Sequence, residues 1–152
     1  MEDEKLHITR RRLPHWTIKG STYFVTFNSI VGELAKKEQT IVLEHIKSGH
    51  GKYYTLYAVA VMQDHVHLLI EPVGEFSLTR IMKGIKGVSA RKINQLRNNI
   101  GSIWQDESYD RIVRDQKEFE EKLNYMYNNP IKSGLTDDPE NYHGWFSNYH
   151  IL

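Results

Sequence analysis

The sequence contains no cysteine among its 152 residues. Disulfide bridges and thiolate metal sites are therefore excluded, and the composition suits a reducing cytoplasm. Long apolar runs are also absent, since none approaches the roughly 20 residues that a membrane-spanning helix needs. The charged residues 1–12 lack the apolar core of a signal peptide. We therefore expect a cytoplasmic protein with no membrane partner.

The chain also has little net charge, because 20 basic residues nearly balance 19 acidic ones and leave +1 at pH 7. The overall charge therefore indicates no class of partner, and only the clustering of basic residues is informative. Such clusters bind phosphates, although a solvated surface has the same pattern. The candidates for phosphate binding are Arg10, Arg11, Arg12, Arg80, Lys83, Lys86, Arg91, Arg111 and Arg114.

Hydrophobic residues make up 39% of the chain, which is enough for one core. We expect one domain over residues 1–152, in which residues 1–12 form a flexible basic arm. Apolar periodicity predicts strands at 22–29, 53–62, 66–72 and 110–115 and helices at 33–46, 78–96 and 116–129. The last helix should stop at Pro130, since the residue before a proline is pushed out of the α region.

The order of these elements is β-α-β-β-α-β-α, and the first six match a ferredoxin-like sandwich. The fold class is therefore α+β, with an antiparallel sheet, helices on one sheet face and a C-terminal helix that carries Tyr125. In the helix at 78–96, the apolar stripe is expected to comprise Leu78, Ile81, Ile85, Val88 and Leu96.

The strand at 66–72 begins beside the first chemical signal, His65-Val66-His67. Side chains alternate across a strand, so His65 and His67 point to one face while Val66 points into the core. Two imidazoles about 7 Å apart along a strand can converge on one metal ion. A His-x-His pair on a solvated sheet face would look the same, and Glu71 shares that face further along the strand.

The last helix carries the second signal. Core spacing of Phe119, Leu123 and Met126 places Tyr127 near the buried stripe and Tyr125 well away from it. Asn129 lies four residues after Tyr125 and shares its face, together with Lys122 as a supporting residue. Tyr127 is therefore expected to pack, whereas Tyr125 lies beside an amide that can bind a metal.

Together these signals predict a specific chemistry. Two neutral imidazoles and a neutral amide leave a metal ion in need of negative charge, which a DNA phosphate oxygen would supply. That arrangement suits Mg²⁺ or Mn²⁺ acting as a Lewis acid. Tyrosine has a pKa of about 10, so its attack on the phosphate would need help from the metal or a nearby base.

The same residues resemble the HUH nucleases, whose His-hydrophobic-His motif is similar to His65-Val66-His67. Tyr125 followed by Asn129-Pro130 and the segment 131–135 resembles the single-tyrosine transposases of the IS200/IS605 type, in their REP-associated tyrosine transposase branch. Segments 23–27 and 104–111 match as well, so the likeness extends over roughly residues 10–149.

This resemblance implies a ferredoxin-like fold in which His65, His67 and Asn129 bind the metal and Tyr125 is the nucleophile. It also implies a strand transferase that cleaves and rejoins single-stranded DNA, next to a hairpin, through a covalent 5′-phosphotyrosine intermediate. Such a protein would be associated with the nucleoid. Insertion-sequence relatives are dimers whose tyrosine serves the partner's site, whereas REP-associated relatives act as monomers, so both a monomer and a homodimer stay open.

The helix at 78–96 has a basic face of Arg80, Lys83 and Arg91, with Gly84 and Gly87 beside it. Each glycine costs helix stability, by up to about 1 kcal/mol relative to alanine, which suggests the close approach of a DNA strand. Trp16 and Trp104 could stack on bases or pack in the core. Two rival hypotheses are an RRM-like module that needs no metal and a metal hydrolase that uses water.

Overall fold

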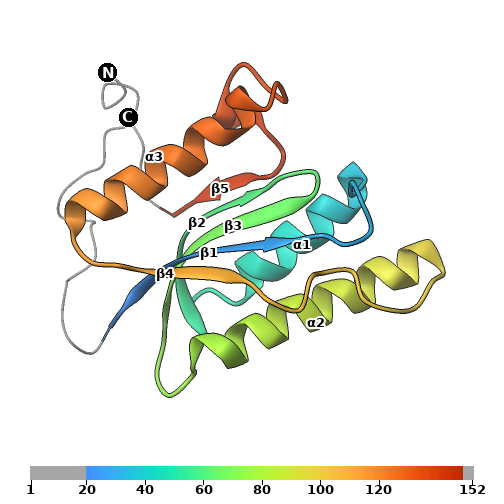
Figure 1. The fold of residues 1–152 in the computed structure, drawn as a ribbon, viewed down its shortest axis with the longest axis horizontal. Helices are drawn as coiled ribbons and strands as arrows, with labels where there is room; N and C mark the ends of the chain where they lie inside the picture. Colours follow the sequence, from blue (N-terminus) through green and yellow to red (C-terminus); the bar gives the residue numbers. More distant parts are fainter. Residues whose placement is uncertain (1–19, 149–152) are drawn as a thin grey trace.

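The computed structural model describes residues 20–148 of the chain (Figure 1). The predicted basic arm at Arg10–Arg12, and Trp16, lie outside these residues. The strands are β1 (Thr22–Asn28), β2 (Tyr54–Val61), β3 (His65–Pro72), β4 (Tyr109–Val113) and β5 (Trp145–Ser147). The helices are α1 (Lys36–Ser48), α2 (Leu78–Arg97), α3 (Gln116–Lys132) and the short 3₁₀ helix η3 (Pro139–Asn141).

The strands form an antiparallel sheet in the order β4-β1-β3-β2-β5. The first four strands of this order, with α1 and α2, give the predicted ferredoxin-like α+β arrangement. The sequence reading missed η3 and β5, which are short and follow a turn-rich segment. No helix of residues 20–148 is both long enough and apolar enough to cross a membrane.

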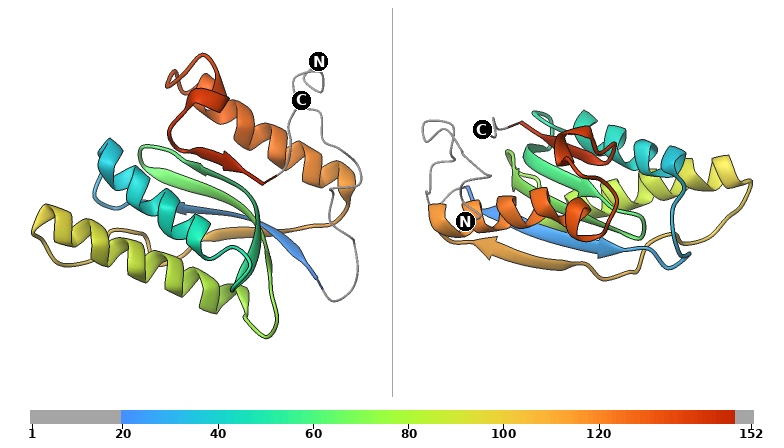
Figure 2. Two further views of the ribbon diagram at one scale, coloured as in Figure 1. Left: turned by 180° about the vertical axis from the view of Figure 1, so that it is seen from behind. Right: turned by 90° about the horizontal axis from the view of Figure 1, so that it is seen from above.

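The sheet separates two apolar cores (Figure 2). On one face, Val66, Leu68 and Ile70 of β3 pack with α1 and α2, as the strand alternation predicts. On the other face, Leu69 packs with Phe119, Leu123 and Met126 of α3. Because α3 has its own core on this face, it covers part of the surface towards which His65 and His67 point.

Proline does not end the last helix where the sequence analysis placed the end. Helix α3 continues through Pro130 to Lys132, and Pro130 is buried one turn beyond Met126 on the same apolar stripe. Proline has no amide hydrogen and therefore removes one hydrogen bond from the helix, and near the helix end this loss disturbs few later turns. Burial of the pyrrolidine ring in the core offsets this loss.

The stripe of α2 also differs from the prediction, because Leu96 is 51% exposed. The buried residues are Ile81, Met82, Ile85, Ser89 and Ile93. Because Ser89 is polar, a pattern of apolar residues does not predict that it is buried. Its hydroxyl donates to the carbonyl of Ile85 and accepts a hydrogen bond from Trp104 Nε1. Trp104 is therefore a core residue, which settles one of the two interpretations offered for it.

An ion pair joins α1 to α2. The Glu38 carboxylate, which is only 4% exposed, accepts hydrogen bonds from Arg97 Nε at 2.6 Å and Nη2 at 2.9 Å. It also accepts one from the amide of Ala35 at the start of α1. The hydrogen bonds from Arg97 outweigh burial and hold the pKa of Glu38 below its usual value.

We predict that Glu38→Gln lowers the free energy of unfolding by about 1–2 kcal/mol at pH 7, because one oxygen facing the guanidinium becomes an NH₂ group. A lowered folded-state pKa means that the stabilisation is present above the unfolded pKa and is lost as the pH falls through the folded value. Urea unfolding should therefore show a difference between wild type and variant that shrinks as the pH falls to about 3.

Glu44→Gln is the matched control, because Glu44 lies on the surface of α1, 3.8 Å from Lys47. Its change in stability should stay within about 0.5 kcal/mol. A difference between wild type and Glu38→Gln that is the same at both pH values would contradict the role given to the Glu38 charge.

Candidate active site

Strand β3 presents His65 and His67 on one face, as predicted. Their ring centroids are 4.8 Å apart. His67 is buried and stacks on Phe24 of the neighbouring strand β1, with ring centroids 5.5 Å apart, whereas His65 is half-buried near the start of the strand. The pair therefore combines one buried imidazole with one that is partly exposed to solvent.

Each histidine has a partner for its Nδ1 atom. His67 Nδ1 lies 2.8 Å from Thr26 Oγ1, and His65 Nδ1 lies 2.7 Å from a carboxylate oxygen of Asp64. A carboxylate accepts a hydrogen bond, so His65 Nδ1 is the donor to Asp64, and Nε2 is the ring nitrogen left for a ligand. If Nδ1 of His67 likewise donates to Thr26, both imidazoles present Nε2 to a ligand, as metal-binding histidines do.

Burial makes His67 a neutral group. Desolvation, followed by the nearby charges of His65 and Lys122, lowers the pKa of His67 to about 3. Its Nε2 is buried, and within residues 20–148 this atom has no hydrogen-bond partner. A buried polar nitrogen without a partner is costly, so this atom is a strong candidate for ligand binding.

Helix α3 brings Tyr125 to the same place. The helix begins at Gln116 and is capped by Asp115, whose carboxylate accepts a hydrogen bond from the Glu118 amide. Its apolar stripe packs on the sheet, and Tyr125 lies outside that stripe with 46% of its surface exposed. The Tyr125 ring centroid is 5.4 Å from that of His67.

Asn129 lies one turn after Tyr125. Its Oδ1 is a second buried atom without a hydrogen-bond partner in the described part of the chain. Two imidazole nitrogens and one amide oxygen are a donor set that fits a divalent ion with remaining positions for oxygen ligands. A group of three His, Cys, Asp or Glu residues suited to a metal is not found within residues 20–148, so a three-ligand site at this place would include the amide.

A shallow hollow of about 380 Å³ lies beside Tyr125 and His67, and its lining residues are Phe24, Thr26, His67, Tyr109, Lys122 and Tyr125. Lys122 Nζ is 4.9 Å from the centroid of the Phe24 ring. The ammonium group therefore lies on the same side of the sheet as Tyr125 and His67. It gives the hollow a positive charge that suits an anionic substrate.

Two alternative residues are engaged elsewhere. Tyr127 packs edge-on against Trp145 with ring centroids 5.4 Å apart, as its place near the stripe predicts. Burial, followed by the charge of Glu140, raises the pKa of Tyr127 to about 12, which makes it a poor nucleophile. Glu71 accepts a hydrogen bond of 2.7 Å from the Tyr57 hydroxyl, so its carboxylate is held away from the histidines.

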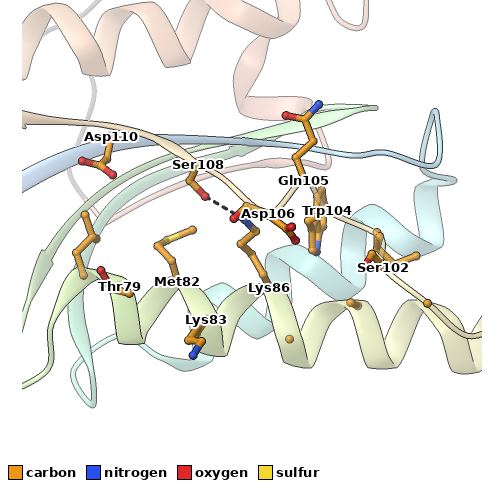
Figure 3. A pocket seen from close by; sticks show the side chains of 15 residues that line it. Thr79, Met82, Lys83, Lys86, Ser102, Trp104, Gln105, Asp106, Ser108 and Asp110 are labelled. Carbon is orange, nitrogen blue, oxygen red and sulfur yellow. Dashed lines mark hydrogen bonds between the residues drawn. The ribbon is translucent and has the colours of Figure 1, made fainter.

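Within residues 20–148, the predicted phosphate-binding residues are spread over several elements instead of meeting at one site. Arg80, Lys83 and Arg91 are exposed along α2. Lys86 instead crosses a pocket of about 520 Å³ on the opposite sheet face and donates to the Asp106 carbonyl and Ser108 Oγ (Figure 3). A Cβ added at Gly84 or Gly87 would meet no atom within 4 Å, so there is open space beside the Cα of each glycine.

Arg111 and Arg114 are arranged around one carboxylate at the start of α3. Arg111 donates to Glu118 through both Nε and Nη2, and Arg114 Nε lies 3.7 Å from the same side chain. These contacts connect β4 to α3. The Glu118 carboxylate also offsets part of the positive charge of the two arginines, which were predicted to bind phosphate.

Sequence reasoning missed Thr26 and Asp64 as residues of the site. Asp64 directly precedes His65, but nothing in the local sequence indicates that its carboxylate lies against the His65 ring. Thr26 is opposite His67 only through the register of β1 and β3. Strand pairing between residues 41 positions apart leaves no local pattern in the sequence.

Comparison with known proteins identifies the family. The model of the IS200-like transposases matches residues 27–129, which include both histidines, Tyr125 and Asn129. A REP-associated tyrosine transposase of Haemophilus influenzae is 24% identical over 134 residues, which cover 78% of this chain and 75% of the relative.

Two solved structures share the fold. One is a REP-associated tyrosine transposase bound to a REP hairpin, with a TM-score of 0.65 and 22% identity over 86% of this chain and 78% of that one. The other is a transposase of Deinococcus radiodurans R1, with a TM-score of 0.51 and 20% identity over 77% of this chain and 96% of that one. Because the family model spans well over half of its residues, the chain belongs to the family of IS200-like transposases.

Proposed function

We propose that the protein belongs to the REP-associated branch and cleaves and rejoins single-stranded DNA beside a hairpin. Tyr125 is the nucleophile, and His65, His67 and Asn129 hold Mg²⁺ or Mn²⁺. The observation that carries this proposal is the meeting of the Tyr125 ring with His67, whose buried Nε2 has no partner in the described chain. The hairpin substrate follows the REP hairpin bound by the structural relative.

In the proposed reaction, Tyr125 Oη attacks the scissile phosphorus, and the bond from phosphorus to the 3′ oxygen breaks. The tyrosine loses its proton, the leaving 3′ oxygen gains one, and the protein is left joined to the 5′ phosphate. Attack by a 3′ hydroxyl on the same phosphorus reverses these changes and rejoins DNA. A bound divalent ion would polarise the phosphate oxygens.

Residues of the chain support this step in separate ways. Thr26 and Asp64 orient the imidazoles, and burial keeps His67 neutral so that its nitrogen can bind an ion. Lys122 brings positive charge to the hollow where the phosphate would lie. On α2, the exposed Arg80, Lys83 and Arg91 are candidates for contacts to the phosphate backbone of the hairpin.

The first test uses hairpin DNA from inverted repeats near the gene, Mn²⁺ and a denaturing gel. We expect a covalent protein–DNA band with wild type and with Tyr127→Phe, and none with Tyr125→Phe, which loses only the attacking hydroxyl. Hairpin binding by Tyr125→Phe should stay within about twofold of wild type, because its ring is retained. Cleavage without a covalent band would favour attack by water, and binding without cleavage would favour a recognition module.

The second prediction concerns the metal. Because all three protein ligands are neutral, the free protein should bind Mn²⁺ weakly, and hairpin DNA should strengthen this binding by adding phosphate oxygen. Asp64→Asn should lower the Mn²⁺ affinity by about 10- to 100-fold, since it weakens the acceptor that orients His65. Calorimetric titration with Tyr125→Phe prevents cleavage during the measurement.

Asp106→Asn is the matched control for this titration, because Asp106 lines the pocket on the opposite sheet face. It should bind Mn²⁺ as tightly as the parent protein. Equal Mn²⁺ affinity with and without DNA would indicate a carboxylate ligand, and Glu71→Gln would then identify or exclude the nearest one on β3.

The third prediction concerns which chain supplies the tyrosine. Tyr125 lies beside His67 of its own chain, so we propose that each chain uses its own tyrosine. A mixture of Tyr125→Phe and His67→Ala should therefore form no covalent adduct. If tyrosines were exchanged within a homodimer, each mixed dimer would contain one complete site, formed by the histidines of one chain and the tyrosine of the other. Adduct formation at about a quarter to half of the wild-type level would therefore contradict the proposal.

A further inference from the structure

Tyr109 is the residue of the hollow that the proposed chemistry leaves without a role. It begins β4, and its Cα is paired with Thr26 of β1, which is in turn paired with His67 of β3. Residues directly opposite one another in antiparallel strands project to the same face. Tyr109, Thr26 and His67 thus form one row across the sheet, and β4 is the edge strand of that row (Figure 1).

The Tyr109 side chain differs from the other aromatic groups of the site. It is 59% exposed, and within residues 20–148 it makes no hydrogen bond or ring contact. Phe24, by contrast, is buried and stacked on His67. Exposed aromatic carbon is energetically unfavourable in water, and here it lines the open side of the hollow that holds Tyr125.

The Lys122 ammonium and the exposed Tyr109 ring are held by different elements that line this hollow. Lys122 and Tyr125 project from α3, whereas Tyr109 projects from the edge strand. A nucleotide has the same division, since its phosphate is anionic and its base has a flat aromatic face. Trp104, the alternative base-stacking residue in the described chain, is buried beneath the opposite sheet face.

We propose that Tyr109 forms a base-stacking subsite that holds a nucleotide next to the phosphate attacked by Tyr125. This role rests on the proposed function, because it places the base relative to the scissile bond. Stacking on an aromatic side chain tolerates any base, since every base has a π-face. The subsite therefore contributes affinity for unpaired DNA, with sequence choice left to other contacts.

The test compares two fluorescent probes of equal length and equal phosphate number, oligothymidine and an abasic strand. Fluorescence anisotropy with Tyr125→Phe as the parent measures affinity without cleavage. We expect Tyr109→Ala to weaken the binding of oligothymidine by at least about fivefold, the lower end for one stacked base, and to leave the abasic strand unaffected. Tyr109→Phe should bind both probes as the parent does, because it keeps the ring.

Tyr53→Ala is the matched control, since Tyr53 is 48% exposed and packs with Phe76 away from the hollow. It should leave both affinities unchanged. An unchanged affinity of Tyr109→Ala for oligothymidine, or an equal loss on both probes, would overturn the stacking role. A shift in sedimentation from dimer to monomer on Tyr109→Ala would overturn it as well, because the ring would then serve an interface between copies at β4.

Failure of this inference can be separated from failure of the proposed function. A covalent adduct from wild type, together with unaltered oligothymidine binding by Tyr109→Ala, would remove only the base subsite. No adduct from wild type, together with base-dependent binding that is lost in Tyr109→Ala, would overturn the tyrosine chemistry and support the subsite.

Discussion

The hydrogen bond between Thr26 and His67 connects the fold of this protein to its chemistry. It joins the neighbouring strands β1 and β3 and engages Nδ1 of the imidazole, which leaves Nε2 as the ring nitrogen for a ligand. Because His67 is buried there, its pKa falls and the ring stays neutral. A neutral nitrogen that has no hydrogen-bond partner within residues 20–148 is available to a metal ion.

Two separate cores make this arrangement possible. The core beneath α1 and α2 fixes the sheet through the buried alternate residues of β3. The second core packs α3 against the opposite face of the sheet and so positions Tyr125 beside His67. The catalytic residues of the proposed reaction therefore come from a strand and a helix that are each held in place by apolar packing. The positions of β3 and α3 depend on these cores and little on the polar residues of the site.

Much of this site follows from local patterns in the sequence. The period of two in His65-Val66-His67 predicts their shared face, and the helical period predicts that Tyr125 and Tyr127 differ, as they do. The ferredoxin-like arrangement of the first four strands followed from the order of elements along the chain, whereas β5 did not. The roles assigned to Tyr125, His65, His67 and Asn129 stay predictions, because geometry alone does not test them.

Other features could not be read locally because they depend on tertiary contacts. Thr26 reaches His67 only through strand register, and Ser89 is buried because Trp104 supplies a donor from a distant segment. The pairing of Arg111 with Glu118 likewise appears only once β4 and α3 are packed. In each case a polar side chain is placed by a partner that the surrounding sequence does not reveal.

The buried proline in α3 has a consequence for how natural variation in this family should be interpreted. Asn129 precedes Pro130, and a residue before proline disfavours the helical conformation. The turn that presents the Asn129 amide is therefore maintained by the packing of Pro130, which is buried on the core stripe. Inherited substitutions that loosen this packing would displace Asn129, the proposed metal ligand, so loss of activity in a variant at position 130 would not show that Pro130 itself takes part in the chemistry.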